Sequence, residues 1–224
     1  MHSDHVVGIP DLLLTGWIHG RRSLLRVWGP TGTEDMMSHM EQAFAFDIHI
    51  RRDVDEKLSG QGVRLEARDI AGGVVVYEKD GVKVTAFFVD HAPIKPAPGY
   101  RIDFAGHSVV LSGDTRYSEN LIRFAQRADV LIHEVIDPET FRGPADFTPE
   151  QVRNVIAHYT TPEQAGTVFS RVNPKLAVYS HIVPAVAPNL AAQMRKTYSG
   201  PLEVGEDLMR IEISEQIQVH RWQH

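Results

Sequence analysis

Two imidazoles and a carboxylate stand within the first five residues of the chain, at His2, Asp4 and His5. Neutral imidazole and carboxylate are the ligands that zinc, iron and manganese take in proteins. Ligands on one helical face would be four residues apart, and these three do not have that spacing. We therefore expect a tight loop, between a strand and a helix, that brings the three side chains onto a metal.

Three further candidate ligands lie far along the sequence, each after a short apolar run that is typical of a buried strand. They are His91, Asp114 and His181. Ligands at successive strand ends allow a layered α/β protein to build one site from distant segments. Glu134 follows a fourth such run, residues 129–133, and is predicted to support the site by orienting a histidine N–H.

The ordered set resembles the metallo-β-lactamase superfamily, and within it the ribonuclease Z and arylsulfatase branch. The resemblance covers nearly the whole chain. It rests on the segments His2-Ser3-Asp4-His5-Val6-Val7-Gly8, Val27-Trp28-Gly29-Pro30, Ser112-Gly113-Asp114-Thr115-Arg116, Leu131-Ile132-His133-Glu134, Thr161-Pro162-Glu163-Gln164-Ala165-Gly166 and Tyr179-Ser180-His181. The family's first motif is H-x-H-x-D-H, and its first histidine would fall just before Met1.

The resemblance implies a centre with two metal ions, most simply zinc, with Mn2+ or Fe2+ as alternatives. One ion would take His2 and His91, and its site would be weakened by the absence of the first histidine. The other ion would take Asp4, His5 and His181, and Asp114 would bridge the two. Such a pair lowers the pKa of water from about 15.7 towards 7, so a metal-bound hydroxide is the expected nucleophile.

The resemblance also indicates which residues could transfer protons. Asp4 could orient the hydroxide and later take its proton. Relatives place a proton-donating histidine before a Ser/Thr-Thr pair, and here His158 and Tyr159 are both candidates for that role. His158 could equally do no more than end a helix, where it would favour the negative pole.

Three other polar residues near these motifs carry weaker expectations. His133, at the end of a buried strand, is expected to be a satisfied core histidine. Asp90 is expected to stabilise the loop next to His91 rather than to bind metal. For Arg116 two alternatives stay open, an anionic substrate and a nearby acidic partner.

The composition is that of a globular protein with a sizeable core, since 42% of the 224 residues are hydrophobic and 23% are charged. A net charge of -6 argues against a broad nucleic-acid-binding surface. There is no cysteine, so a metal must be held by His, Asp or Glu. No apolar run is long enough to cross a membrane, and no signal peptide is visible. A cytoplasmic location is the default, and a secreted or periplasmic one stays open.

Strands and helices alternate without a linker or repeat, which predicts one α/β domain over residues 1–224. We expect the αββα sandwich of the superfamily, lacking its N-terminal strands. Residues 92–98, with three prolines, should form a loop, and Thr33 should cap a helix running from Glu34 into the 50s. A stripe containing Met36, Met37 and Met40 should face the core. The expected helices are 8–20, 34 to the 50s, 118–126, one starting at Pro149, 163–172 and 187–198; the expected strands are 24–28, 74–77, 82–89, 100–104, 108–111, 129–133, 176–180, 208–213 and 217–222.

Residues 92–113 are all that separate His91 from Asp114. Ribonuclease Z enzymes commonly carry a long tRNA-gripping arm in this region, so tRNA is not the expected substrate. We expect a small-molecule or anionic ester, no membrane partner and, by analogy with relatives, a homodimer.

The function predicted from the sequence is that of a metal-dependent hydrolase of a phosphodiester or related ester, of the phosphodiesterase or arylsulfatase-like kind. A lactonase or β-lactamase-type hydrolase is one alternative. The other is a metal-binding fragment with weak or no activity, which the missing first histidine favours. The sequence also predicts that the in-frame DNA upstream encodes a histidine directly before Met1, preceded by further strands.

Overall fold

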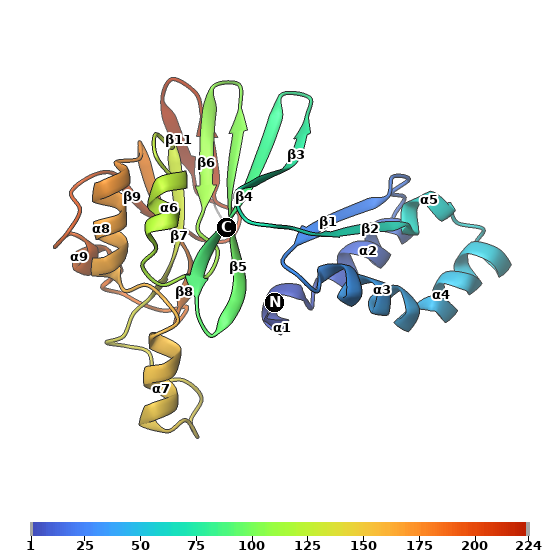
Figure 1. Cartoon of the computed structure of the whole chain (residues 1–224), viewed down its shortest axis with the longest axis horizontal. Coiled ribbons are helices and arrows are strands. Elements are labelled where there is room, and N and C mark those ends of the chain that lie inside the picture. Colours follow the sequence, from blue (N-terminus) through green and yellow to red (C-terminus); the bar gives the residue numbers. More distant parts are fainter. Residues whose placement is uncertain (1, 223–224) are drawn as a thin grey trace. The chain divides into compact units, whose positions relative to one another are not determined.

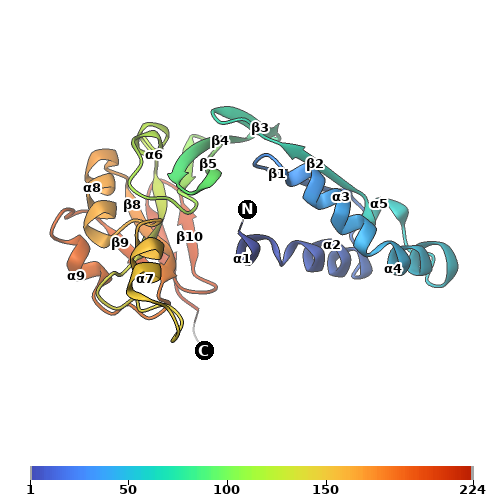
Figure 2. The same ribbon diagram turned by 60° about the horizontal axis from the view of Figure 1, so that its bottom comes forward.

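The structure is a computed structural model that describes residues 2–222; Met1, Gln223 and His224 lie outside the described residues. The chain divides into two compact units, Met1–Ala71 and Gly72–His224, which we call the N-terminal and C-terminal units. Figures 1 and 2 show the elements of each unit. The single domain expected over residues 1–224 stays a prediction.

The N-terminal unit contains a parallel two-stranded sheet, β1 (Leu25–Gly29) with β2 (Leu65–Asp69). β2 was missed by the sequence analysis. The helical elements are α1 (Ser3–Val6), α2 (Ile9–Ile18), α3 (Thr33–Ala43), α4 (Ala45–His49), the π-helix η1 (Ile50–Val54) and α5 (Gly60–Val63). The expected helix from Glu34 into the 50s is therefore interrupted at Phe44.

The start of α3 differs from the expectation that Thr33 caps it. The N-cap is Gly32, whose φ of 98° suits glycine, and Thr33 is the first helical residue. The Asp69 carboxylate, at the end of β2, accepts from the N–H groups of Gly32 (2.9 Å) and Glu34 (3.0 Å). A distant acceptor thus satisfies the unpaired N–H groups, which local sequence reasoning could not find.

The predicted methionine stripe is confirmed as core. Met37 and Met40 are buried with Leu13 from α2, and Leu25 and Leu65 pack against them from β1 and β2. Burying a side chain of this size contributes about 1.5–3 kcal/mol, so this cluster holds α2 and α3 on the small sheet.

The C-terminal unit is built on a seven-stranded sheet in the order β3-β4-β5-β6-β7-β8-β9. The strands are β3 (Val74–Lys79), β4 (Val82–His91), β5 (Ile94–Phe104), β6 (His107–Leu111), β7 (Val130–Ile136), β8 (Leu176–Val183) and β9 (Leu202–Val204). The predicted hairpin at Lys79-Asp80-Gly81 is present, with positive φ at Asp80 and Gly81 as a tight hairpin turn requires. β9 was not predicted.

The proline-rich residues 92–98 are not the expected loop, because most of them belong to β5. Val89 pairs with Ala97 and Phe88 with Pro98. In the described ladder, β5 pairs with β6 only from Tyr100 onward. The prolines of β5 therefore lie where the strand has one neighbour, and a missing N–H donor is tolerated there.

The helices of this unit are α6 (Glu119–Phe124), α7 (Pro149–Ile156), α8 (Pro162–Val172) and α9 (Leu190–Met194). Threonine capping boxes begin α7 and α8, as the Thr-Pro pairs predict, whereas residues 187–198 form only the short α9. In Figures 1 and 2, α6, α8 and α9 lie on one side of the sheet. Phe87, Leu131 and Tyr179 of the sheet pack there with Leu121 and Phe169 of the helices.

An antiparallel hairpin of β10 (Arg210–Ile213) and β11 (Ile217–His220) supplies Ile211 and Val219 to a second cluster around Val130, Leu176 and Val178. Val178 and Tyr179 are consecutive on β8 and so belong to opposite faces of the sheet. The sheet is thus covered by helices on one face and, in part, by this hairpin on the other. Among residues 2–222, no helix combines the length and apolar character needed to cross a bilayer.

Candidate metal centre

The direction of its strands brings four of the predicted site residues of the C-terminal unit to one edge of the sheet. β6, β7 and β8 are parallel, and β4 runs the same way because two antiparallel pairings separate it from β6. The carboxyl ends of these strands therefore meet at one edge of the sheet. His91 ends β4, Asp114 follows β6, Glu134 lies in β7 and His181 lies in β8.

His91 is held in one orientation. Its side chain is 3% exposed, and its Nδ1 lies 2.9 Å from the main-chain oxygen of His158. A carbonyl oxygen can only accept, so Nδ1 donates to it, and in the neutral imidazole that metal binding requires Nε2 carries the lone pair. Nε2 lies 3.9 Å from Asp114 Oδ2. This tautomer, fixed by a backbone carbonyl, is the one that a metal-binding histidine requires.

Asp114 stands between two histidines. Its Oδ2 faces His91, while its Oδ1 lies 3.6 Å from Nδ1 of His181. The side chain of Asp114 is 10% exposed. Each carboxylate oxygen is thus directed at a different imidazole.

His181 reaches the site through an irregularity in β8. The register between β7 and β8 shifts so that Ser180 and His181 together oppose Glu134, and His181 has a φ of 46°. Such a bulge re-aims a side chain that a regular strand would direct elsewhere. No local sequence pattern indicates this bulge.

Tyr159 lies close to both of these histidines. Its ring centroid is 5.3 Å from that of His91 and stacks at 5.8 Å on that of His181. The ring of His158 is edge-on to His91 at 6.0 Å, just beyond the end of α7. Both proton-donor candidates are therefore near predicted ligands, and His158 also positions His91 through its main chain.

Glu134 is buried and supports the site differently from the expectation. Its Oε1 accepts from the N–H of Thr160 at 2.9 Å, not from a histidine. Burial raises its pKa well above the usual value, and the negative charge of Asp114 adds to this effect, against the hydrogen bond from Thr160. Oε2 has no hydrogen-bond partner among the described residues. The Glu134 carboxyl therefore holds a proton more readily than an exposed glutamate does.

Thr160 links its own loop to the loop after β6 and to β7, and it was missed by the sequence analysis. It is buried, its hydroxyl donates to the Thr115 carbonyl at 2.7 Å, and its carbonyl accepts from the N–H of Ile136 at 3.0 Å. Thr115 in turn donates to the Asp90 carbonyl at 3.2 Å. The sequence feature that could have pointed to Thr160 is the run Thr160-Thr161-Pro162, which leads into α8.

The expectation for Asp90 is confirmed. His133 lies in the core as expected but is not fully satisfied, because its Nε2 has no hydrogen-bond partner among the described residues. His133 is fully buried, contacts the Glu134 carbonyl through Nδ1 at 2.6 Å, and has its pKa lowered by burial to about 4. The Asp90 carboxylate accepts from the Ala92 N–H at 3.1 Å and so stabilises the turn after His91. Arg116 has a partner outside the two alternatives, because its guanidinium donates to the Ala92 carbonyl at 2.6 Å.

The remaining three predicted ligands belong to the N-terminal unit. They lie on α1 and at its N-cap, which replaces the tight loop that we expected. His2 is the N-cap residue and Asp4 is in the first turn. The side chains of Asp4 and His5 are 70% and 39% exposed, and His5 Nε2 lies 3.6 Å from Asp4 Oδ2. One turn of helix thus presents both side chains on the surface of this unit.

The residues present in the C-terminal unit fit a metal ion. Zinc binds nitrogen and oxygen at about 2.0–2.2 Å, which in tetrahedral geometry places two ligand atoms about 3.3–3.6 Å apart. The two distances from the Asp114 oxygens, 3.6 and 3.9 Å, are close to this. Imidazoles and a carboxylate, one imidazole with its proton fixed on the far nitrogen, form a donor set that zinc accepts.

Comparisons with known proteins agree with this centre. A family model described as a β-lactamase superfamily domain matches residues 1–182, which run through both units. The chain is 30% identical to the ribonuclease Z of Mycobacterium bovis (strain BCG / Pasteur 1173P2) over 95% of its own length and 77% of that protein's. Two solved structures, both 17% identical, share the fold. They are the metallo-β-lactamase fold protein YhfI from Bacillus subtilis (TM-score 0.64, covering 98% of this chain and 74% of that one) and the short form of human tRNase Z (TM-score 0.63, covering 93% and 74%).

The chain therefore belongs to the β-lactamase superfamily and has the metallo-β-lactamase fold, as predicted. It is a hydrolase of this superfamily, and its relatives include enzymes named ribonuclease Z. The fold implies metal binding, which agrees with the donor set around Asp114.

Proposed function

We propose that this protein is a dinuclear metal-dependent hydrolase of phosphodiesters or related esters, of the ribonuclease Z and arylsulfatase-like kind. The observation that supports it most strongly is the position of Asp114, with one oxygen towards His91 and the other towards His181. Imidazole nitrogen offers a single lone pair, whereas a carboxylate can serve two cations at once. An aspartate between two histidines is therefore suited to bridge two metal ions.

The proposed ligand set divides six residues between two ions. His2 and His91 would hold one ion, Asp4, His5 and His181 the other, and Asp114 both. We take zinc as the first choice and Mn2+ or Fe2+ as alternatives. The ion held by His2 and His91 has fewer ligands in this chain and should be the weaker one.

Bound divalent metal supplies Lewis acidity, which acidifies water and neutralises charge on the substrate oxygens. The protein's own residues would orient and move protons around it. Asp4 is proposed to accept a proton from the attacking water. Tyr159 is the better placed of the two donor candidates, because its ring faces both His91 and His181. His158 keeps His91 in its metal-binding tautomer.

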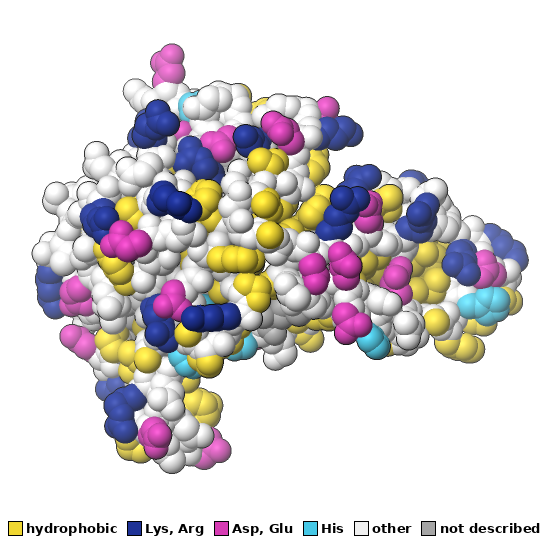
Figure 3. All heavy atoms as spheres, viewed as in Figure 1, with side chains coloured by type: hydrophobic (Ala, Val, Ile, Leu, Met, Phe, Trp, Pro, Cys, Tyr) yellow, Lys and Arg dark blue, Asp and Glu magenta, His cyan; other side chains and the backbone are white. Residues whose placement is uncertain are grey.

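The substrate is proposed to be a small anionic ester, and not tRNA. Residues 92–113 form β5, β6 and their connections, so this region contains no long arm. On the face drawn in Figure 3, acidic and basic side chains of the C-terminal unit are interspersed and do not form a basic track. A cytoplasmic location and a homodimer also stay proposals.

The experiment is a metal and substrate screen. The full chain is loaded with Zn2+, Mn2+ or Fe2+, its metal content is measured, and turnover of bis(p-nitrophenyl) phosphate, p-nitrophenyl sulfate and an aromatic lactone is followed. We expect two metals per chain and fastest turnover of the phosphodiester, with Asp146→Asn, an exposed loop carboxylate, as a control of unchanged activity. Metal binding without turnover of any ester would instead favour the weakly active fragment, and preferred turnover of the lactone would favour the lactonase alternative.

A further inference from the structure

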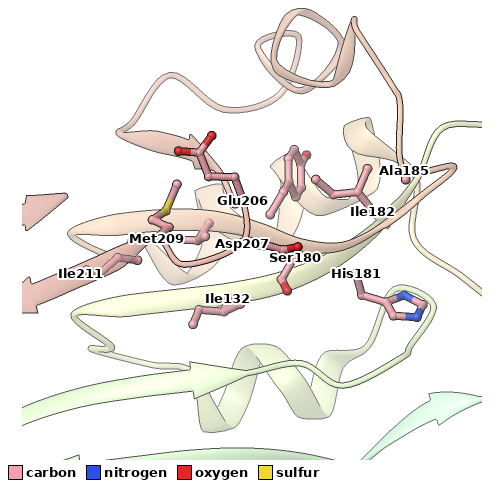
Figure 4. A pocket seen from close by; sticks show the side chains of 12 residues that line it. Ile132, Ser180, His181, Ile182, Ala185, Glu206, Asp207, Met209 and Ile211 are labelled. Atoms are coloured by element: carbon pink, nitrogen blue, oxygen red, sulfur yellow. The ribbon is translucent and has the colours of Figure 1, made fainter. Parts of the chain in front are cut away.

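A pocket of about 370 Å3 adjoins His181 within the C-terminal unit. Figure 4 shows His181 at one end of it and Met209 and Ile211 towards the other. The pocket is formed by β7, by the bulged end of β8 and by the segment that leads from β9 into β10. Its size is within the range of small-molecule sites, about 300–1,000 Å3. The sequence analysis predicted a strand over residues 208–213 but gave residues 205–211 no part in a site.

The lining has two chemical characters. Ile132, Met209 and Ile211 provide an apolar wall, which suits a hydrocarbon or aromatic body. Ser180, Glu206 and Asp207 add a hydroxyl and two carboxylates. Among the described residues that line the pocket, none is a lysine or an arginine.

The two carboxylates differ in how far they are neutralised. The Glu206 carboxylate forms an ion pair with Arg221, whose Nη1 lies 2.8 Å from Oε2. Asp207 is exposed, and in the described part of the chain no ion pair or hydrogen bond engages its side chain. Asp207 therefore gives the lining of the pocket a carboxylate that no ion pair neutralises in the described part of the chain.

We propose that this pocket binds the alcohol portion of the ester substrate, and that this portion combines an apolar body with a cationic amine or quaternary ammonium end. The inference rests on the proposed function, because it places the reacting ester at the metal centre and its alcohol portion beyond His181. A second phosphate in the pocket would meet the Asp207 carboxylate and be repelled by it. The pocket thus selects against polynucleotides and for small diesters with a positive group.

The kinetic test uses two substrates with the same chromogenic group, p-nitrophenyl phosphorylcholine and bis(p-nitrophenyl) phosphate. Asp207→Lys should lower kcat/KM for the choline ester by about tenfold or more, mainly through KM, because a like charge would then face the cation. Bis(p-nitrophenyl) phosphate, which has a second aromatic group in place of the choline cation, should change by less than about threefold. Glu215→Lys, the same charge change in the turn between β10 and β11, is the control and should leave the ratio of the two substrates unaltered. An equal effect of Asp207→Lys on both substrates would overturn the proposal.

A binding test separates this proposal from the hydrolase activity. Backbone amide NMR spectra of the full metal-free chain are recorded with benzyltrimethylammonium, benzyl alcohol or benzylphosphonate. We expect amide shifts at Ser180, Gly205 and Asp207 that are strongest for the cation, weaker for the alcohol and absent for the phosphonate. In the Asp207→Lys variant the shifts caused by the cation should disappear. Binding of the phosphonate as tightly as the cation, or no shifts at these residues, would overturn the proposal. Wild-type protein that binds the cation here but hydrolyses no ester would instead contradict the proposed function alone.

Discussion

In the C-terminal unit, His91 and Asp114 stand at the ends of buried strands and are almost inaccessible to solvent, whereas in the N-terminal unit Asp4 and His5 stand exposed on one turn of helix. His91 is fixed by the His158 carbonyl, and the loops around it are tied together by Thr160 and Thr115. The buried polar residues of the two units differ in the same way. Among the described residues of the N-terminal unit only Thr33 is polar and buried, while the C-terminal unit buries His91, His133 and Glu134.

The difference indicates that the C-terminal unit carries the preorganised part of the metal centre. A ligand that is already held in its binding geometry loses little freedom when metal binds. Exposed side chains on a short helix lose more freedom when metal binds. We therefore expect substitutions among the C-terminal residues to have the larger effects.

The largest effect is expected for Asp114→Ala. If one carboxylate serves both ions, its removal should leave at most one weakly held metal. Activity should fall by more than about 100-fold, a larger loss than the roughly 10–100-fold loss expected when a residue that only supports a ligand is removed. Metal content and phosphodiester turnover of the purified variant measure this. His5→Ala should retain the ion at His91 and lose less activity. An equal loss of metal in both variants would contradict the unequal division of the centre between the units.

Glu134→Ala should have a smaller effect, on the order of 10–100-fold in activity or metal affinity, because Glu134 acts through Thr160 and not on the metal. Glu134→Gln keeps an oxygen that accepts from the Thr160 N–H and should preserve most of the function. Since the buried carboxyl already has a raised pKa, the neutral amide resembles its protonated form. Full loss of activity in the glutamine variant would show that the charge of Glu134 is needed.

The buried His133 predicts acid sensitivity of the C-terminal unit. Its pKa is about 4 in the folded protein and about 6.5 when unfolded, so between these values the unfolded chain binds more protons. His133 therefore has no effect on stability above pH 6.5, and it destabilises the fold progressively as pH falls towards 4. The loss should approach about 3 kcal/mol, measured by urea unfolding between pH 7.5 and 4.5. His133→Phe should flatten this dependence, and an unchanged slope would contradict the assignment.

A smaller effect is expected in the N-terminal unit for Asp69→Asn. The N–H groups of Glu34 and Gly32 hold the pKa of Asp69 below its usual value, so its stabilisation is present above the unfolded pKa and is lost as pH falls through the folded one. Asparagine keeps the acceptor but loses the charge at the start of α3. Thermal unfolding should show a lower Tm than wild type at pH 7, and this difference should shrink as the pH falls below the unfolded pKa of aspartate. Asp55→Asn, which changes an exposed carboxylate, is the control.

The sequence identified the family, most strands and the residues at the strand ends, because apolar runs that end in His or Asp are local features. It did not find the contacts that fix those residues. The caps of α3 come from Asp69, distant in sequence, and the bulge at Ser180 and His181 depends on pairing with β7. The prolines at residues 92–98 indicated a loop. Whether a strand can contain them depends on which neighbouring strands pair with it there, and a local pattern does not show this. The pocket beside His181 arises from the approach of β8 and the 205–211 segment, which no local pattern encodes.

The central claim, that Asp114 bridges two metal ions, is tested most directly by anomalous diffraction at the zinc edge from crystals of the full chain grown with zinc. The account predicts two peaks within bonding distance of the Asp114 carboxylate, about 2.0–2.2 Å, one next to His91 Nε2 and one next to His181, with the peak at His91 the weaker. Peaks that are bonded to the histidines but not to Asp114, or a single strong peak at His91, would contradict it.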